Sequence, residues 1–236
     1  MDNYNPEVIR GNIKAILENI YEACEKYGNK NTELMAVTKT VPPEVVNLVF
    51  ENGISLLGEN RVQEFLGKKD SYDLKEHNGI APAVHFIGHL QTNKVKYIIN
   101  DIDMIQSVDS LKLAQEINRL AIVNNRITDI LCEVNIGGED SKNGIAPNDT
   151  LPLIKELASL EGIRVRGLMT IPPPIDSDVH FGRMAELFNT IKDRNIEGVS
   201  MEVLSMGMTH DYVNAVKYGS SIVRIGTGIF GGRTYR

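Results

Sequence analysis

The chain has 236 residues, 42% of them hydrophobic and 24% charged, which is enough for one sizeable core and excludes wholesale disorder. Its net charge of −6 argues against general nucleic-acid binding, because an acidic surface repels a phosphate backbone. The N-terminal residues show no signal-peptide pattern and no apolar run reaches about 18 residues, so we expect a cytoplasmic protein without a membrane span. Cys24 and Cys132 lie in apolar patterns and are expected to be reduced, buried thiols, and no residue spacing indicates a metal site.

The first elements along the chain are a helix, a strand and a second helix. Pro6 is expected to begin the first helix with Asn5 as its cap, because isoleucines then recur on one face from position 9 to position 20. The apolar run Leu34-Met35-Ala36-Val37 is too short for a helix and predicts a buried strand. Pro42 and Pro43 open the next helix, which Gly53 closes.

The alternation of strand and helix continues to the end of the chain. Seven further strands are predicted at Ser55–Leu57, Val84–Ile87, Met104–Ser107, Asp129–Asn135, Arg164–Thr170, Val203–Ser205 and Ile222–Ile225. Helical patterns lie between them, one with Asp109 as its expected cap, whereas the polar segment from Lys68 to Ala81 is expected to be a flexible loop. Eight such units predict a closed (β/α)8 barrel formed by residues 1–236 as a single domain. A doubly wound open sheet is the alternative.

Barrels of this type carry their functional residues at the carboxyl ends of the strands. Lys39 follows the first strand, where burial of its stem would disfavour the ammonium form and lower the pKa of the amine. A neutral amine can attack an aldehyde and form an imine. The alternative is a rim lysine whose ammonium reaches water.

Two glycine-rich turns follow the seventh and eighth strands, where barrels commonly bind phosphate. They read Ser205-Met206-Gly207-Met208-Thr209 and Gly226-Thr227-Gly228. Hydroxyl groups can donate to phosphate oxygens, and glycines let backbone N–H groups approach closely. The alternative is that these glycines only form the turns between strand and helix.

Arg224 is a charged residue inside the apolar strand Ile222–Ile225 and therefore needs an acceptor. A pyridine nitrogen would be suitable, and a structural ion pair with Glu202 or Glu133 is the alternative. Other polar residues near the strand ends have simpler interpretations. His89 and His210 are expected to act as hydrogen-bonding or capping groups. Glu59 and Glu64 are expected to be a helix-start cap and part of a solvated face.

These residues occur in sequence blocks that resemble one known family, the YggS/PROSC-type pyridoxal phosphate homeostasis proteins. The resemblance runs from about Gly11 to the C-terminus and is carried by six blocks in order. They are AVTK at 36–39, LGENRVQE at 57–64, HFIGHLQTNK at 85–94, GLMTI at 167–171, LSMGM at 204–208 and VRIGTGIFG at 223–231.

The resemblance implies the barrel of the alanine racemase N-terminal domain and pyridoxal 5′-phosphate (PLP) as the cofactor. It implies that Lys39 holds PLP as a Schiff base and that Arg224 faces the pyridine nitrogen. The remaining cofactor-binding positions that it implies are Ser205, Gly207, Gly226 and Thr227 for the phosphate, with Asn60 and His85 near the cofactor.

The function implied by the resemblance is PLP binding and supply rather than catalysis, with apo PLP-dependent enzymes as expected partners. An amino-acid racemase using the same imine is the main alternative, and a Schiff-base aldolase acting on sugar phosphates is another. We expect no second, β-rich domain of the racemase kind and no tyrosine near Lys39, so a second catalytic base is missing. Without that domain, a monomer is expected.

Overall fold

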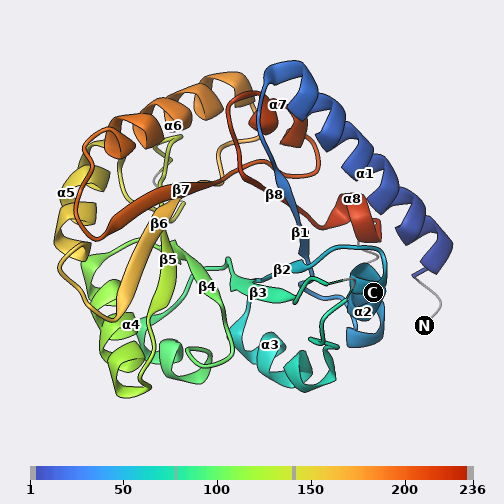
Figure 1. Ribbon diagram of the computed structural model, residues 1–236, viewed down its shortest axis with the longest axis horizontal. Helices are drawn as coiled ribbons and strands as arrows, with labels where there is room; N and C mark the ends of the chain where they lie inside the picture. Colours follow the sequence, from blue (N-terminus) through green and yellow to red (C-terminus); the bar gives the residue numbers. More distant parts are fainter. Residues whose placement is uncertain (1–3, 78, 140–141, 233–236) are drawn as a thin grey trace.

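The computed structural model describes residues 4–77, 79–139 and 142–232, and in these ranges eight parallel strands close into a barrel in the order β1 to β8 (Figure 1). Closure occurs where β8 pairs with β1, so the open doubly wound sheet is excluded. The strands are β1 Glu33–Val37, β2 Leu56–Glu59, β3 Ala83–Phe86, β4 Met104–Val108, β5 Thr128–Glu133, β6 Ile163–Met169, β7 Val199–Ser205 and β8 Ile222–Ile225.

Helices surround the strands on the outside of the barrel. They are α1 Pro6–Tyr27, α2 Pro43–Glu51, α3 Val62–Lys68, α4 Leu111–Val123, α5 Pro147–Leu157, α6 Ser177–Lys192, α7 Tyr212–Lys217 and α8 Thr227–Phe230, with short 3₁₀ helices η1 Lys69–Ser71 and η2 Thr92–Tyr97. Within the described ranges, no helix is both long and apolar enough to cross a bilayer.

The long first helix begins where the sequence predicts. Asn5 caps α1 by accepting hydrogen bonds from the N–H groups of Glu7 and Val8, and Pro6 occupies the first turn. Gly28 ends the helix in the left-handed conformation, with φ of 70°. The apolar face of α1 packs on α7 and α8, which brings the N-terminal end of the helix beside the segment that follows β8.

Three local expectations are wrong. Ser110, not Asp109, caps α4, because its side chain accepts the N–H of Leu113. The segment 68–81 is not simply a polar loop, because Lys68 ends α3 and is buried, as is Tyr72. Strand β7 begins at residue 199, four residues before the predicted start at 203.

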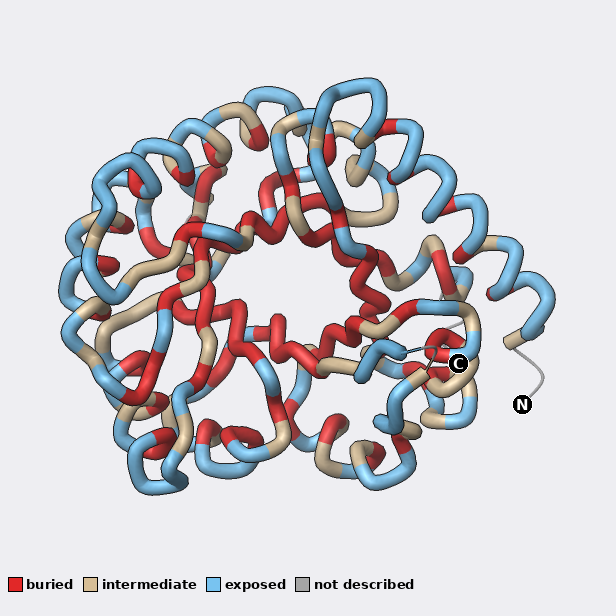
Figure 2. Tube along the Cα trace, in the orientation of Figure 1, coloured by how far each residue is buried: buried red, intermediate tan, exposed pale blue. Residues whose placement is uncertain are grey.

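The core has an outer layer between strands and helices and an inner layer inside the barrel. Alternation along each strand separates the two layers. In β1, Leu34 and Ala36 join the outer cluster, whereas Met35 and Val37 join a separate inner cluster. Figure 2 shows the resulting ring of buried strand residues, with exposed residues on the outer sides of the helices. A residue two positions beyond Val37 would therefore face the inside of the barrel, as Met35 and Val37 do.

Candidate functional site

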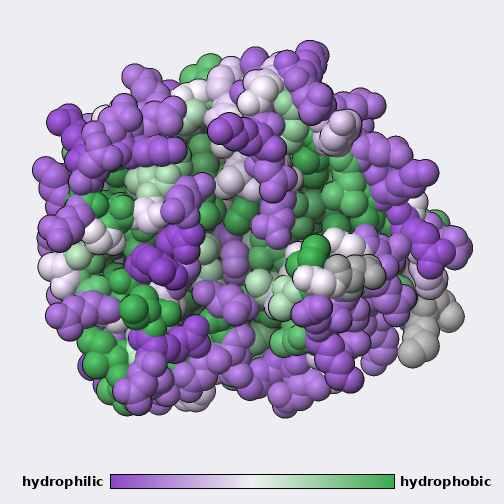
Figure 3. Space-filling view, in the orientation of Figure 1, coloured by the Kyte–Doolittle hydropathy of each residue, from purple (hydrophilic) through white to green (hydrophobic). Residues whose placement is uncertain are grey.

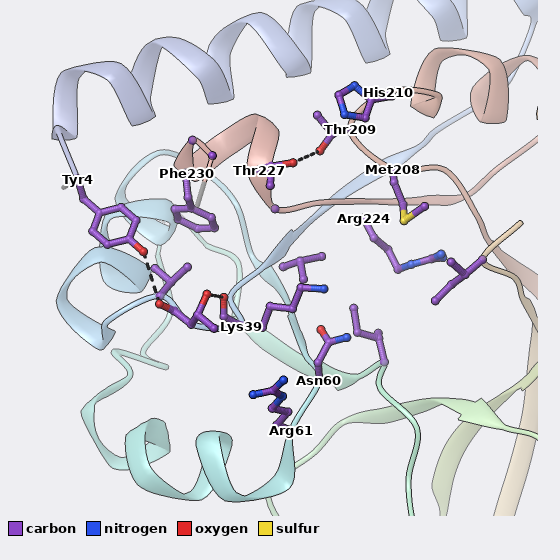
Figure 4. Close-up of a pocket in the computed structure, with 18 residues that line it drawn as sticks. Tyr4, Lys39, Asn60, Arg61, Met208, Thr209, His210, Arg224, Thr227 and Phe230 are labelled. Carbon is purple, nitrogen blue, oxygen red and sulfur yellow. Dashed lines mark hydrogen bonds between the residues drawn. The ribbon is translucent and has the colours of Figure 1, made fainter. Parts of the chain in front are cut away.

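A cavity of about 690 Å³ opens at the carboxyl ends of the strands. Its walls come from the segments after β1, β2, β3, β6, β7 and β8, together with the start of the described chain. The lining residues are Tyr4, Val37, Lys39, Thr40, Val41, Asn60, Arg61, Ile87, Ile171, Met208, Thr209, His210, Arg224, Gly226, Thr227, Phe230, Gly231 and Gly232. Figure 4 shows this arrangement, with Lys39 and Arg224 directed into the same space.

The charge of the cavity is opposite to that of the whole chain. Lys39, Arg61 and Arg224 line it, and among the described residues no aspartate or glutamate does. The chain carries a net charge of −6, so the basic lining is a local feature. In Figure 3, hydrophobic surface lies in the central hollow and hydrophilic side chains surround it. This combination favours a small anionic ligand with an apolar part.

Lys39 reaches the cavity because it continues the inner row of β1. Met35 and Val37 face the inside of the barrel, and Lys39 comes two residues later, just beyond the end of the strand. Its side chain is partly buried and lines the cavity. The amine therefore lies at the barrel mouth, as the sequence predicted, where a bound carbonyl compound could meet it.

Arg224 faces the inside of the barrel from β8 and is 3% exposed. Its NH1 donates to Ser205 Oγ at 2.7 Å, and its NH2 donates to the backbone oxygen of Thr170 at 2.8 Å. Burial lowers the pKa of the guanidinium to about 10, partly offset by the charges of Glu133 and Asp211. At neutral pH the group therefore remains a cation.

The ion-pair alternative for Arg224 is wrong. In the described ranges, no carboxylate oxygen lies within 4.0 Å of a side-chain nitrogen of Arg224, so Arg224 forms no salt bridge there. Glu202 pairs with Arg166 instead. Glu133 acts on Arg224 only at longer range, and burial together with the charge of Asp109 raises the pKa of Glu133 to about 7 against the lowering effect of Arg224. The cation at the cavity floor is held by neutral acceptors and remains available to a ligand.

Ser205 and His85 lie beneath the cavity rather than in its lining. Ser205 Oγ accepts from Arg224 and donates to Gln106 Oε1 at 2.7 Å, while Gln106 Nε2 lies 2.9 Å from His85 Nδ1. Burial lowers the pKa of His85 to about 4, so the ring is neutral and accepts from Gln106. This buried chain fixes the position of Arg224. Gln106 was missed, although a polar residue inside the apolar strand β4 was a usable signal.

Gly207 also lies outside the lining and serves the turn after β7. Its φ is +97°, and an added Cβ would lie 2.5 Å from the Cβ of Ala215. Its carbonyl oxygen accepts the N–H of Arg224 at 2.9 Å. The glycine thus joins the β7 turn to β8 directly below the cavity.

Two threonine hydroxyls form the upper wall of the cavity. Thr209 Oγ1 lies 3.1 Å from Thr227 Oγ1 and accepts the N–H of Gly228 at 3.2 Å (Figure 4). The pair brings together the turns after β7 and β8, and Gly226 lines the cavity beside it. Thr209 was not among the predicted binding residues, although it belongs to the predicted glycine-rich turn.

Asn60 contributes an unsatisfied acceptor. Its Oδ1 is buried and receives no hydrogen bond from the residues that the structure describes. The side chain lines the cavity between Lys39 and Arg61 in the view of Figure 4. A buried acceptor without a donor is costly, so a ligand hydroxyl or N–H at this place would remove the penalty.

Some of the remaining residues at the rim line the cavity, and others lie outside it. His210 and Tyr4 line it, and Tyr4 was missed because it lies far from Lys39 in sequence. The Tyr4 hydroxyl donates to the backbone oxygen of Thr40 at 3.5 Å. His89 is outside the lining, with its Nδ1 3.6 Å from a carboxylate oxygen of Asp109.

Glu59 and Glu64 do not have the structural roles expected of them, a helix-start cap and part of a solvated face. Strand β2 continues to Glu59, whose side chain is fully buried, and Arg61 takes the position before α3 without a capping hydrogen bond. Glu64 accepts hydrogen bonds from Lys68 and from the backbone N–H of Thr40, so it does not belong to a solvated face.

Comparison with known proteins places this barrel in a family. The family model described as alanine racemase, N-terminal domain, matches residues 11–234. A pyridoxal phosphate homeostasis protein of Aquifex aeolicus is 42% identical over 229 residues, covering 94% of this chain and 97% of the relative. The solved structure of PipY from Synechococcus elongatus with PLP bound has a TM-score of 0.77 at 27% identity, covering 90% of this chain and all of PipY.

A more distant structure shows the fold alone. An alanine racemase of Clostridium difficile superimposes with a TM-score of 0.74 at 19% identity, and the match covers 98% of this chain but 58% of the racemase. The barrel is thus shared with the racemase, whereas the full-length relatives are homeostasis proteins. The chain belongs to the pyridoxal phosphate homeostasis protein family, which is built on the alanine racemase N-terminal domain.

Proposed function

We propose that the cavity at the barrel mouth binds PLP, held through Lys39, and that the protein stores and supplies the cofactor. The observation that carries this proposal is the meeting of an amine, a buried arginine and two hydroxyls in one cavity that no described carboxylate lines. PLP is a dianionic phosphate joined to an aldehyde-bearing pyridine, and each of these parts has a suitable group opposite it. The structure of PipY with PLP bound supports the choice of ligand.

Six residues of the cavity would each have a defined task. Lys39 would hold the aldehyde carbon as an imine. Thr209, Thr227 and Gly226 would bind the phosphate, Asn60 Oδ1 would accept a hydrogen bond, and Arg224 would donate to the pyridine nitrogen. Ser205, Gly207 and His85, predicted as binding residues, would act from below by holding Arg224 in place.

Arg224 also supports storage rather than turnover. Bound PLP supplies an electron sink, whose strength depends on protonation of the ring nitrogen. A guanidinium keeps its proton, so Arg224 would leave that nitrogen neutral and the sink weak. The expected partners remain apo PLP-dependent enzymes, and a monomer remains the expected state.

One observation favours the racemase alternative. Tyr4 lines the same cavity as Lys39 and could act as a second acid or base. In Figure 4, however, its hydroxyl is directed to the backbone of Thr40, whereas the Lys39 side chain extends away from it toward Arg224. The rate at which a bound amino acid exchanges its α-proton therefore decides between PLP storage and racemase activity.

The direct test of the site is chemical labelling. Purified protein is mixed with PLP, its absorbance spectrum is recorded, and the imine is reduced with borohydride before peptide mapping. We expect a yellow protein with one reduced adduct on Lys39, because Lys39 is the only lysine among the described residues that line the cavity. An adduct on Lys68 or Lys94 in place of Lys39 would refute the site assignment.

The test of storage against turnover uses Arg224→Glu. For the wild type, we expect α-proton exchange of alanine in heavy water far below ~1 s⁻¹, the low end of ordinary turnover. A carboxylate would favour a protonated ring nitrogen, so Arg224→Glu should raise the exchange rate by about tenfold or more, equivalent to ~1.4 kcal/mol of barrier. Exchange is followed by proton NMR.

The uncharged Arg224→Gln variant is the matched control and should not accelerate exchange. Thermal unfolding of each variant shows whether the buried substitution is tolerated. Wild-type exchange at enzyme-like rates, slowed by Tyr4→Phe, would establish the racemase alternative instead.

A further inference from the structure

The wall that carries Lys39 is supported by a buried cluster of charges. Lys68, 7% exposed at the end of α3, has its Nζ 3.0 Å from Glu59 Oε1 and 2.8 Å from Glu64 Oε1. Glu59 is fully buried and also accepts from the Tyr72 hydroxyl at 2.5 Å. Buried charged groups destabilise the fold unless they are paired and hydrogen-bonded. Few arrangements of these side chains are therefore compatible with the folded state.

The cluster contacts the backbone on both sides of Lys39. On one side, Lys68 Nζ donates to the backbone oxygen of Thr38 at 2.8 Å, and the Thr38 hydroxyl donates to Glu59 at 2.5 Å. On the other side, the backbone N–H of Thr40 donates to the Glu64 carboxylate. Lys68 contacts both carboxylates and the backbone oxygen of Thr38. It therefore links the contacts made to Thr38, before Lys39, with the contact made to Thr40, after Lys39.

The residue after Lys39 has an unfavourable backbone conformation. Thr40 has a φ of +64°, in the left-handed region that β-branched residues rarely adopt. Such a conformation persists only where the surroundings hold it. Here the N–H of Val41 closes a turn on the Thr38 oxygen at 3.0 Å, the Thr40 hydroxyl donates to the Lys39 oxygen at 2.6 Å, and the Glu64 carboxylate accepts the Thr40 N–H. The direction in which the chain leaves Lys39 therefore depends in part on this cluster, which also binds the Thr38 oxygen of the turn.

We propose that Lys68 is a positioning residue for Lys39. It holds Glu59 and Glu64 in the places from which they fix Thr38 and Thr40, and thereby keeps the Lys39 amine aimed into the cavity. The inference rests on the proposed function, because it concerns how readily Lys39 forms its bond to the cofactor. Lys68 itself is unsuited to that bond, since three oxygen atoms surround its amine.

The test separates covalent bonding from binding of the ring and phosphate. In Lys68→Met, we expect the equilibrium constant for the reducible imine with PLP to fall by about tenfold or more, which corresponds to ~1.4 kcal/mol. Affinity for pyridoxamine 5′-phosphate, which has no aldehyde, should change less than about twofold, because the phosphate wall lies on other strands. Imine absorbance and fluorescence titration measure the two quantities.

The matched control is Lys69→Met. Lys69 is the next residue in the chain, but its amine pairs with Asp101 at 2.9 Å. The control should leave both quantities unchanged. A second variant, Glu64→Ala, removes the acceptor of the Thr40 N–H while keeping the Lys68–Glu59 pair. It should also weaken the imine selectively, and it carries the test if Lys68→Met does not fold.

Rescue by glycine tests the mechanism itself. Glycine adopts a positive φ without the steric penalty of threonine. Adding Thr40→Gly to Lys68→Met, or to Glu64→Ala, should restore a large part of the lost imine, whereas Thr40→Gly alone should retain it. A merely structural loss would lower pyridoxamine 5′-phosphate binding equally and would not be rescued.

Two further outcomes have different meanings. Normal imine formation in both Lys68→Met and Glu64→Ala would overturn the positioning role and leave the proposed function standing. Failure of the wild type to form any reducible bond at Lys39 would overturn the proposed function, and the positioning role with it.

Discussion

Lys39→Ala is expected to abolish imine absorbance and borohydride labelling completely. The reason is geometric, because among the described residues Lys39 is the only lysine in the cavity lining and the buried Lys68 amine is occupied by three oxygens. Binding of pyridoxamine 5′-phosphate, which needs no amine partner, should persist. Absorbance, labelling and fluorescence titration of the same preparations give the three measurements.

Lys94→Ala provides the matched control for this loss. Lys94 belongs to one of the blocks that carry the family resemblance, but it lies in η2 outside the cavity lining, over the ring of Tyr97. The control should remain yellow and be labelled at Lys39. Retention of the imine band in Lys39→Ala would show that another amine forms the bond and would remove the basis of the proposed site.

Removal of the phosphate from the ligand is expected to have the second large effect. Charge-assisted hydrogen bonds contribute roughly 1.5–3 kcal/mol each, so two such bonds predict that pyridoxal binds about 10²–10⁴-fold more weakly than PLP. The hydroxyls of Thr209 and Thr227 are the candidate donors. Titration of the apo-protein with each aldehyde, followed at the imine band, measures the ratio.

The double variant Thr209→Val with Thr227→Val keeps the shape of the wall and removes both hydroxyls. It should lower PLP affinity toward that of pyridoxal, while pyridoxal affinity stays nearly constant. Ser205→Ala is the informative comparison, because Ser205 contacts Arg224 and Gln106 instead of lining the cavity. Equal affinity of the wild type for PLP and pyridoxal would show that these turns do not bind phosphate.

The fold was largely predictable because the apolar pattern repeats eight times. Each predicted strand overlaps one that is observed, and the last, Ile222–Ile225, agrees at both ends. Lys39 and Arg224 were recognisable because each is a charged residue in or just after an apolar strand, near the glycine-rich turns, and because both belong to blocks that carry the family resemblance. Strand β2 shows the limit, because Glu59 was expected at the start of a helix, whereas the strand continues to Glu59 and its side chain is buried.

The number of strands, the end of the barrel at which Lys39 and Arg224 lie, and the glycine-rich turns could all be predicted from the residue pattern. The depth of each residue in the barrel could not, because depth follows from the register between neighbouring strands. Pairing of Met35 with Arg224 places the arginine below Lys39, and closure of the barrel leaves Ser205 beneath the cavity. Packing of α1 brings Tyr4 to the mouth, and the contacts of Lys68 with Glu59 and Thr38 form only once α3 lies against β2, so no local pattern encodes them.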